Sequence, residues 1–330
     1  MAHPAQHLIL VGACYLDTVL NVPHFPEEDS KLRATSLRVR RGGNCPNTLE
    51  VLQQLLRQGS TTATRRDVVP HLVSCLPAAG SAATAKILSS FGDDTLADFS
   101  RCLYRRGHAE PASCYIIQSQ AAGTRTIVNY NDLPEMTVQE LGDIADGFRD
   151  MPQSWWHFEG RIPGTTLACI RYLRRVLPEC RTSVEVEKPG RDGLRELAAA
   201  ADVVFYSRAW AESQGYESAD ACLRGEEAAS KSSLAFCTWG AQGACALSPE
   251  KMMVQRPIRP TEGHLDVVDT IGAGDTFIAG VLFGLLCHSA DWNTEATLRF
   301  AVDLATQKVQ MDGFAGLGAV AATYSSRVSS

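Results

Sequence analysis

The sequence predicts an α/β protein in which a mostly parallel sheet carries helices on both faces, with a small β-sheet lid attached. Continuous apolar runs of strand length recur along the chain, and segments with helical spacing lie between most of them. Such alternation is typical of βαβ units and therefore of a parallel sheet covered on both faces. Stretches of short polar–apolar alternation predict the lid, since exposed strands show that pattern.

The first core strand is expected at His7–Ala13, an apolar run of the kind found in buried parallel strands. Apolar spacing predicts a helix over Asn47–Gln58, and the polar stretch Ser60–Asp67 is expected to be a surface loop. Further helices are expected, for example, at Thr165–Val176 and Gly193–Ala201. The later strands are expected at Val68–Leu76, Ser113–Gln118, Thr126–Tyr130, Trp155–Glu159, Thr182–Val186, Asp202–Tyr206, Leu234–Thr238, Cys245–Leu247 and His264–Val268.

The lid is expected to come from two separate segments. Tyr15–Arg41 alternates and contains prolines, which favours exposed antiparallel strands. Ser113–Tyr130 contains two strand-like runs around Ala121-Ala122-Gly123, a hairpin candidate. The two segments together would form one small sheet, and the remainder of a single domain over residues 1–330 would form the α/β core.

Composition excludes several classes of protein. The 330 residues are 45% hydrophobic with a formal charge of −6, so the chain is neither disordered nor basic enough overall for a nucleic-acid partner. The longest apolar stretch, Phe277–Cys287, is too short to span a membrane. The N-terminus lacks the pattern of a signal peptide. The eleven cysteines are scattered, which predicts free thiols. Because free thiols are typical of a reducing compartment, we expect a cytoplasmic protein.

A glycine-rich turn near the C-terminus carries the strongest chemical signal. The predicted strand ending at Val268 is followed by Gly272-Ala273-Gly274 and by helical spacing. The glycines allow close approach of a ligand, and the free N–H groups of a helix start bind anions. Asp275 is expected to be ionised there and is a candidate base for a hydroxyl that attacks a phosphoryl group. It could instead merely cap the helix.

Two other phosphate-binding motifs are excluded. A dinucleotide fingerprint would need a third glycine where Phe277 stands, and no Gly-Lys pair exists for a P-loop.

A second signal, Arg41-Gly-Gly-Asn-Cys-Pro-Asn47, gathers backbone N–H groups and the carboxamides of Asn44 and Asn47 beside Gly43. These groups suit a polyhydroxylated ligand, although a glycine turn with an asparagine helix cap is an equal alternative.

Taken together, RGGNCPN near the N-terminus and DTIGAGDTFIAG near the C-terminus resemble the two signatures of the PfkB (ribokinase-like) family of carbohydrate kinases. The resemblance extends in order over nearly the whole chain. It implies a ribokinase-like three-layer α/β/α core of roughly nine strands with a small β lid. Further segments are similar to members that phosphorylate a ketohexose such as fructose: Leu16-Asp17, Pro26–Arg33, Gly123–Asp132, His157–Arg161, Ser183–Pro189, Asp202–Phe205, Thr238–Ala244 and Asp312–Phe314.

The resemblance also implies a site for an ATP-dependent sugar kinase with Asp275 as general base. The positions matching the family's sugar-binding residues are Asp17, Gly43, Asn44 and Asn47, beside Asp275 itself. The lid arginine that reaches the nucleotide phosphates matches Arg125. The ATP-binding loops match Gly240, Ala241, Gln242 and Gly243, and Gly272, Ala273 and Gly274.

Metal binding is the least defined part of the expected site. Mg²⁺ would accompany ATP, and Asp269 matches a position that contributes to a K⁺ site in some members. The family's usual Asn-x-x-Glu is replaced by Ser207–Trp210, so the metal ligands stay unknown, with Glu187 or Glu159 as candidates.

Three alternatives stay open from the sequence. The chain could phosphorylate another sugar such as ribose, or a nucleoside such as adenosine, or it could be a non-catalytic sugar-binding regulatory relative.

A homodimer joined through the lids is expected, because a small sheet with an apolar face must bury that face. The residues expected on that face are Val19, Val22, Leu32, Leu37, Tyr115, Ile117 and Ile127.

Overall fold

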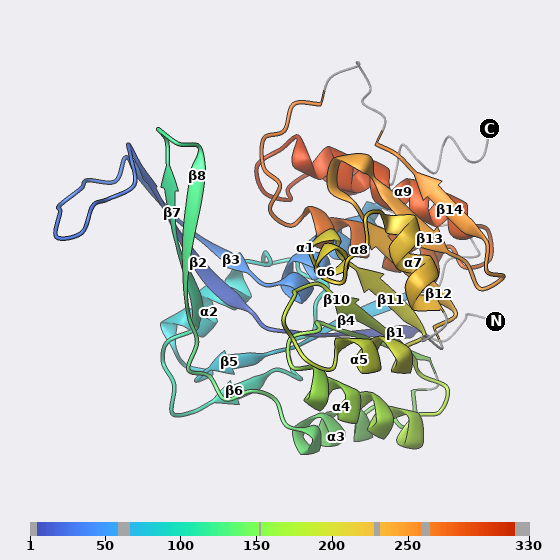
Figure 1. The fold of residues 1–330 in the computed structure, drawn as a ribbon. Helices are drawn as coiled ribbons and strands as arrows, with labels where there is room; N and C mark the ends of the chain where they lie inside the picture. Colours follow the sequence, from blue (N-terminus) through green and yellow to red (C-terminus); the bar gives the residue numbers. More distant parts are fainter. Residues whose placement is uncertain (1–4, 59–66, 152, 228–231, 259–264, 321–330) are drawn as a thin grey trace.

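The computed structural model describes residues 5–58, 67–151, 153–227, 232–258 and 265–320 (Figure 1). The main-sheet strands are β1 (Gln6–Val11), β4 (Val68–Val73), β9 (Ser154–Phe158), β10 (Arg181–Val186), β11 (Val203–Tyr206), β12 (Leu234–Thr238), β13 (Ala244–Leu247) and β14 (Met253–Arg256). The other strands are β2 (Tyr15–Val22), β3 (Ser36–Gly42), β5 (Cys75–Pro77), β6 (Leu103–Arg105), β7 (Ala112–Ser119) and β8 (Thr124–Tyr130). The helices are α1 (Asn44–Gln58), α2 (Ala82–Ser89), α3 (Val138–Asp146), α4 (Pro163–Val176), α5 (Leu194–Ala200), α6 (Arg208–Ser213), α7 (Ala219–Glu227), α8 (Ala273–Cys287) and α9 (Thr294–Val309), with a 3₁₀ turn η1 (Gly240–Gln242).

The central sheet confirms the predicted α/β class. Within the described residues it has eight strands in the order β14-β13-β12-β11-β10-β9-β1-β4, and all neighbours from β12 to β4 are parallel. The strand expected at His264–Val268 is wrong for its described part: residues 265–268 form no strand, and the N–H of Val268 instead donates to the carbonyl of Val309 at 2.7 Å. His264 itself, like Ser60–Arg66 of the expected surface loop, lies outside the described residues.

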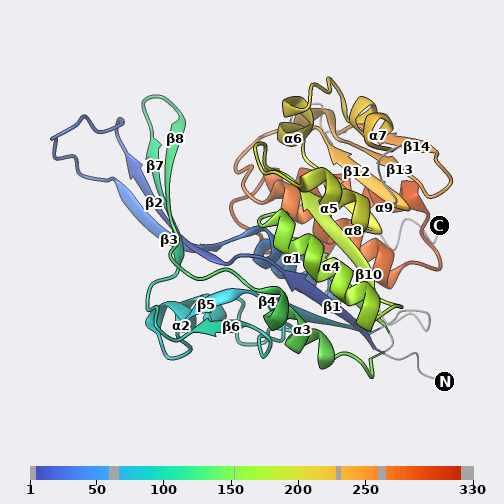
Figure 2. The same ribbon diagram turned by 60° about the horizontal axis from the view of Figure 1, so that its bottom comes forward.

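Helices cover both faces of this sheet, giving three layers (Figures 1 and 2). The helices α1, α8 and α9 pack on one face and α3, α4, α5 and α7 on the other. Alternate residues of β1 accordingly enter opposite cores, Leu8 and Leu10 on the first side and Ile9 and Val11 on the second. No helix within these described ranges is both long enough and apolar enough to cross a bilayer.

The two predicted lid segments join into one four-stranded sheet, β3-β2-β7-β8, which projects from the body (Figures 1 and 2). The outer pairs, β2 with β3 and β7 with β8, are antiparallel as the two segments predicted, while the central strands β2 and β7 run parallel. The sheet is therefore mixed. A parallel pair cannot be joined by a tight turn, and the chain between β2 and β7 indeed passes through the core.

The strand register divides the apolar lid residues between two faces. Val19 and Ile127 share the face of Asp17 and Arg125, which looks toward the core. Leu37, Tyr115 and Ile117 belong to the opposite face together with Val22, and Leu32 lies outside the strands. The expected single apolar face is therefore wrong, because neighbouring side chains of a strand point to opposite sides.

All eleven cysteines are free thiols, and nine of them are buried. Thiols at these positions behave as small apolar groups in the core. The predicted absence of a disulfide framework is therefore confirmed.

Candidate active site

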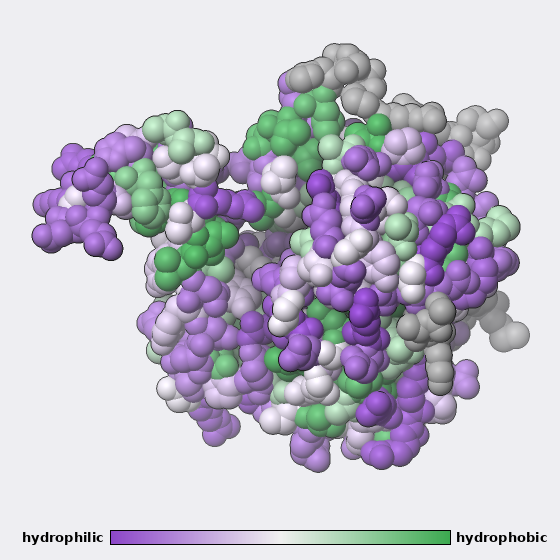
Figure 3. Space-filling view, viewed as in Figure 1, coloured by the Kyte–Doolittle hydropathy of each residue, from purple (hydrophilic) through white to green (hydrophobic). Residues whose placement is uncertain are grey.

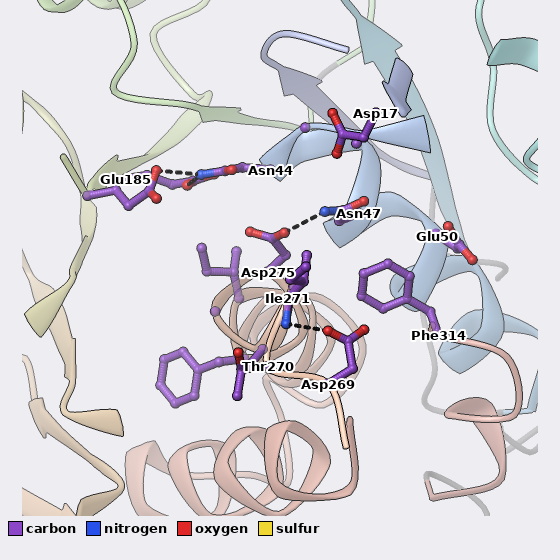
Figure 4. Close-up of a pocket in the computed structure, with 18 of the residues that line it drawn as sticks. Asp17, Asn44, Asn47, Glu50, Glu185, Asp269, Thr270, Ile271, Asp275 and Phe314 are labelled. Carbon is purple, nitrogen blue, oxygen red and sulfur yellow. Dashed lines mark hydrogen bonds between the residues drawn. The ribbon is translucent and has the colours of Figure 1, made fainter. Parts of the chain in front are cut away.

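A cavity of about 670 Å³ lies between the lid and the carboxyl ends of β10, β11 and β12. Figure 3 shows the surface hollowed where the lid meets the body, and Figure 4 shows the side chains within. The inner face of the lid, the start of α1 and the N-terminus of α8 complete the wall. Open α/β sheets commonly bind ligands beyond the carboxyl ends of their strands, so this is the expected place for a site.

The glycine turn before α8 has two glycines with different structural needs. Gly272 is the N-cap of α8 with φ +78°, and a Cβ there would lie 2.3 Å from the ring of Phe314. Gly274 has no positive φ, and a Cβ there would meet no protein atom within 4 Å. The fold therefore requires a glycine at 272, whereas at 274 only the cavity in front of the helix gives a reason for one.

Asp275 occupies the first turn of α8 and lines the cavity. Its Oδ2 accepts a hydrogen bond of 2.8 Å from Nδ2 of Asn47, while Arg41 donates to Oδ1 of the same carboxamide at 3.3 Å (Figure 4). The hydrogen bond from Asn47 holds this carboxylate from α1, and within the described residues the carboxylate does not cap its own helix. Asn47 thus positions Asp275 and is engaged on both ends of its amide.

The pKa of Asp275 is shifted in the direction opposite to the one that the helix N-terminus alone would favour. Burial raises the pKa of this carboxyl well above its usual range, the Glu185 carboxylate raises it further, and the hydrogen bond from Asn47 lowers it. The expectation considered only the helix N-terminus, which favours an anion. For a carboxyl group buried this deeply, desolvation is the larger effect on the pKa.

Asn44, the first residue of α1, is held by two carboxylates. Its Nδ2 donates to Oε2 of Glu185 at 2.7 Å and to Oε2 of Glu187 at 2.9 Å. This amide therefore does not cap α1. Burial and the neighbouring Glu187 raise the pKa of Glu185 to about 8. The amide oxygen of Asn44 has no hydrogen bond to any described residue and is available to a ligand hydroxyl.

Asp17 reaches the cavity from β2 of the lid. Its Oδ1 is buried without a hydrogen-bond partner among the described residues. Gly42 makes room for this carboxylate, since a Cβ at 42 would lie 2.4 Å from Oδ2 of Asp17. A buried acceptor without a donor is costly, so the site fits a ligand that supplies a hydroxyl here.

The expected nucleotide residues are only partly brought together. Arg125, on β8 of the lid, lines the cavity with Gly272–Asp275. Gly240–Gly243 do not line it; they form the turn η1 directly after Thr238, which does. The cavity lining therefore includes Thr238, at the end of β12, but not the glycine turn that follows it.

Of the two candidate metal ligands, one faces the cavity. Glu187 lines it, whereas Glu159 lies beneath and accepts a 3.0 Å hydrogen bond from the backbone N–H of Ala13. Burial and the Glu185 carboxylate raise the pKa of Glu159 to about 7. An oxygen donor that suits Mg²⁺ is therefore present on the cavity side at Glu187.

Asp269 does not present a free cation site. The fully buried Lys308 donates from Nζ to the carbonyl oxygen of Asp269 at 3.0 Å and to Oδ2 of Asp269 at 3.1 Å. The backbone N–H of Ile271 donates to Oδ1 of Asp269 at 2.9 Å. An ammonium group already occupies the oxygens that a K⁺ ion would need, so the residues present do not fit K⁺ at Asp269.

Sequence reasoning missed several residues around the cavity. Lys188, Arg40 and Cys114 all line it, and Lys188 has no hydrogen bond or ion pair within the described ranges. Lys188 could have been found from the pattern, since it lies two residues after the buried run that forms β10. No comparable signal marks Cys114, which lies between the buried Ser113 and the exposed Tyr115.

Comparisons with known proteins support the same class of site. Residues 5–316 match the family model described as pfkB family carbohydrate kinase. Ketohexokinase of Mus musculus is 30% identical over 321 residues, which cover 94% of this chain and 99% of the mouse protein. The ribokinase of Arabidopsis thaliana, solved with ribose and ATP, has a TM-score of 0.75 at 18% identity, covering 98% and 99% of the two chains. A nucleoside kinase of Methanocaldococcus jannaschii has a TM-score of 0.70 at 16% identity, covering 98% and 100%. At these identities the two solved structures show the shared fold.

Proposed function

The chain belongs to the pfkB family of carbohydrate kinases, and we propose that it transfers the γ-phosphoryl group of ATP to a hydroxyl of a ketohexose such as fructose. The observation that most directly supports this proposal is the position of the Asp275 carboxylate, which Asn47 holds at the N-terminus of α8 inside the cavity. The ketohexose is favoured over ribose or adenosine by the 30% identity to mouse ketohexokinase, compared with 18% and 16% to the ribokinase and the nucleoside kinase.

The sugar is proposed to lie between the lid and α1. The unpartnered Oδ1 of Asp17 accepts one hydroxyl, and the free oxygen of Asn44 accepts another. Asn47 acts mainly through Asp275, whose carboxylate it orients. Carboxylate and amide oxygens in this arrangement discriminate against analogues that lack the hydroxyls, since their own polar atoms are then left unpaired.

In the proposed reaction the ionised Asp275 takes the proton of the attacking hydroxyl. That oxygen forms a bond to the γ-phosphorus as the bond to the β–γ bridging oxygen breaks, and ADP leaves. The N–H groups at the start of α8 stabilise the charge that develops on the phosphoryl oxygens. Arg125 from the lid and Lys188 from the core side supply cations at the same cavity.

The same cavity suits MgATP as the phosphoryl donor. Mg²⁺ bound with ATP neutralises phosphate charge, and Glu187 is the carboxylate proposed to hold it. Gly240–Gly243 remain the proposed loop for the distal part of the nucleotide, since they continue the wall after Thr238.

A screen of ADP release tests the proposal. Purified protein with MgATP is offered fructose, tagatose, ribose, adenosine or buffer, and the position of the new phosphate is read by NMR. We expect the highest kcat/KM for fructose, with the phosphate on a primary hydroxyl. A preference for ribose or adenosine would replace the substrate but retain the kinase. Sugar binding without any ADP release would favour the non-catalytic relative.

We further propose a homodimer that joins through the outer lid face, defined as Leu37, Val39, Tyr115, Val128 and Tyr130. These side chains are exposed by 62%, 36%, 49%, 57% and 47% and share one face by register. Figure 3 shows hydrophobic residues along the projecting lid. An apolar face of this kind on an isolated small sheet favours burial against a second copy.

A further inference from the structure

Directly beneath the sugar side of the cavity, three ligand-type side chains converge in the core. The thiol of Cys45, the imidazole of His157 and the carboxylate of Glu185 place one ligand atom each within 4.8 Å of the other two. Nε2 of His157 lies 3.1 Å from Oε1 of Glu185. Cys45 and His157 are fully buried, and Glu185 is 3% exposed.

These residues come from three different elements with fixed geometry. Cys45 is in the first turn of α1, His157 is in β9, and Glu185 is in the neighbouring strand β10. Parallel pairing of β9 with β10 sets His157 opposite Ser183, so Glu185 lies two residues further along β10 on the same face of the sheet. The group is therefore preorganised by the sheet and by the docking of α1, and needs no loop to close around it.

The imidazole also has the outer partner that metal-binding histidines usually have. Nδ1 of His157 lies 2.8 Å from the hydroxyl of Ser183, which in turn accepts 2.8 Å from the indole of Trp155. With Nδ1–H donating to that hydroxyl, the lone pair of Nε2 points toward Cys45 and Glu185. Such a hydrogen bond fixes both the tautomer and the ring plane of a metal ligand.

The charge around the group favours a cation. The carboxyl groups of Glu159, Glu185 and Asp275 all lie near the Cys45 thiol, and carboxyl oxygens attract a cation. The positive charges of Lys188 and Arg191 lower the pKa of Glu185 and so favour its carboxylate form. One thiolate and one carboxylate balance a divalent ion, so the occupied group would be neutral, which a buried site requires.

We propose that Cys45, His157 and Glu185 form a binding site for a soft divalent cation of the Zn²⁺ class. Thiolate and imidazole select such ions over Mg²⁺, and three protein ligands with one open position are a known zinc arrangement. On binding, the thiol proton of Cys45 leaves to solvent as the metal–sulfur bond forms. The ion enters from the cavity side, where Glu185 forms part of the floor.

An ion at this site is one carboxylate away from the sugar. Oε1 of Glu185 faces the group, while Oε2 accepts the hydrogen bond from Asn44. Metal binding would therefore be coupled to sugar binding, a consequence that rests on the proposed function. The metal site itself does not rest on it, and its test needs neither sugar nor ATP.

The test uses Co²⁺ as a spectroscopic probe, followed by displacement with Zn²⁺. Chelator-treated full-length protein is titrated with CoCl₂ while the visible and near-ultraviolet spectra are recorded. We expect one ion per chain, a tetrahedral d–d spectrum and a thiolate-to-cobalt charge-transfer band, all abolished by one equivalent of Zn²⁺. Cys45→Ala removes the band and weakens Zn²⁺ binding by at least about tenfold. Cys169→Ala, a buried cysteine of α4 far along the chain, is the matched control and keeps both.

Circular dichroism confirms that both variants are folded. Absence of the charge-transfer band in the wild type would overturn the proposal whether or not the variants fold. Binding that persists unchanged in Cys45→Ala would equally overturn it, because the ion would then lie elsewhere.

Discussion

Replacing Gly274 with alanine separates the needs of the fold from those of the ligand. Gly274 is the second residue of α8, has ordinary helical φ and would place its new Cβ in open space, with no protein atom within 4 Å. Exchanging glycine for alanine at a compatible site stabilises a protein by about 0.4–1 kcal/mol, chiefly by restricting the unfolded chain. We therefore expect the Tm of Gly274→Ala to stay equal or to rise by about 2 °C.

Catalysis should change in the opposite direction. The new methyl group occupies the space through which a phosphate would reach the first N–H groups of α8. Displacing the phosphate by about 1 Å costs on the order of 100-fold in rate, which corresponds to about 2.7 kcal/mol in the activation free energy. We expect kcat/KM for MgATP to fall by that factor, with little change in the Kd of the sugar.

Gly164→Ala is the matched control. Gly164 is the second residue of α4, and a Cβ there also meets no atom within 4 Å, but it lies outside the cavity lining. Thermal melts and initial rates are measured for both variants. The reasoning about the helix start is refuted if Gly274→Ala keeps full activity. If it unfolds while Gly164→Ala does not, the glycine serves the fold instead.

Three further variants address the proposed site and dimer. Asp275→Asn keeps the shape of the side chain but cannot take a proton, so kcat should fall by about 10²–10⁴-fold, and a fall in kcat of less than tenfold would remove Asp275 as the base. Because burial raises the pKa of Asp275, the kcat/KM of the wild type should decline with falling pH already above the usual aspartate range. Arg125→Ala should raise the KM for ATP and leave that for the sugar nearly unchanged, and the reverse pattern in initial-rate kinetics would move Arg125 out of the nucleotide site. Leu37→Glu combined with Tyr115→Glu should turn a species of twice the chain mass into a monomer in sedimentation velocity, whereas a wild-type monomer at micromolar concentration would contradict the dimer.

The fold was largely predictable because its signals are local. Continuous apolar runs such as His7–Ala13 mark strands that are buried on both faces, and the glycines before α8 mark a turn at which a helix begins. The expected strand at His264–Val268 shows the limit: Val268 donates its N–H to the carbonyl of Val309 at the end of α9, a partner that no local pattern reveals.

The site was predictable in membership and less so in detail. Asn44, Asn47 and Asp275 stand in the two motifs and Asp17 in a further segment of the resemblance, and all four line one cavity. Their hydrogen-bond partners could not be foreseen, since they depend on contacts between residues far apart in the sequence, such as Asn44 with Glu185. The lid posed the same difficulty, because the register of β2 with β7 decides which apolar side chains are exposed.

The contact between Lys308 and Asp269 has a consequence for the ionic conditions under which the protein works. Lys308 is anchored in α9, so its positive charge is tethered to the glycine turn and cannot be diluted away. A tethered group has a very high effective concentration at its partner. A turn held by a dissociable ion would loosen as that ion becomes scarce. Here the turn should keep its shape equally in sodium, potassium or tetramethylammonium salts, and the rate should be insensitive to the choice among them.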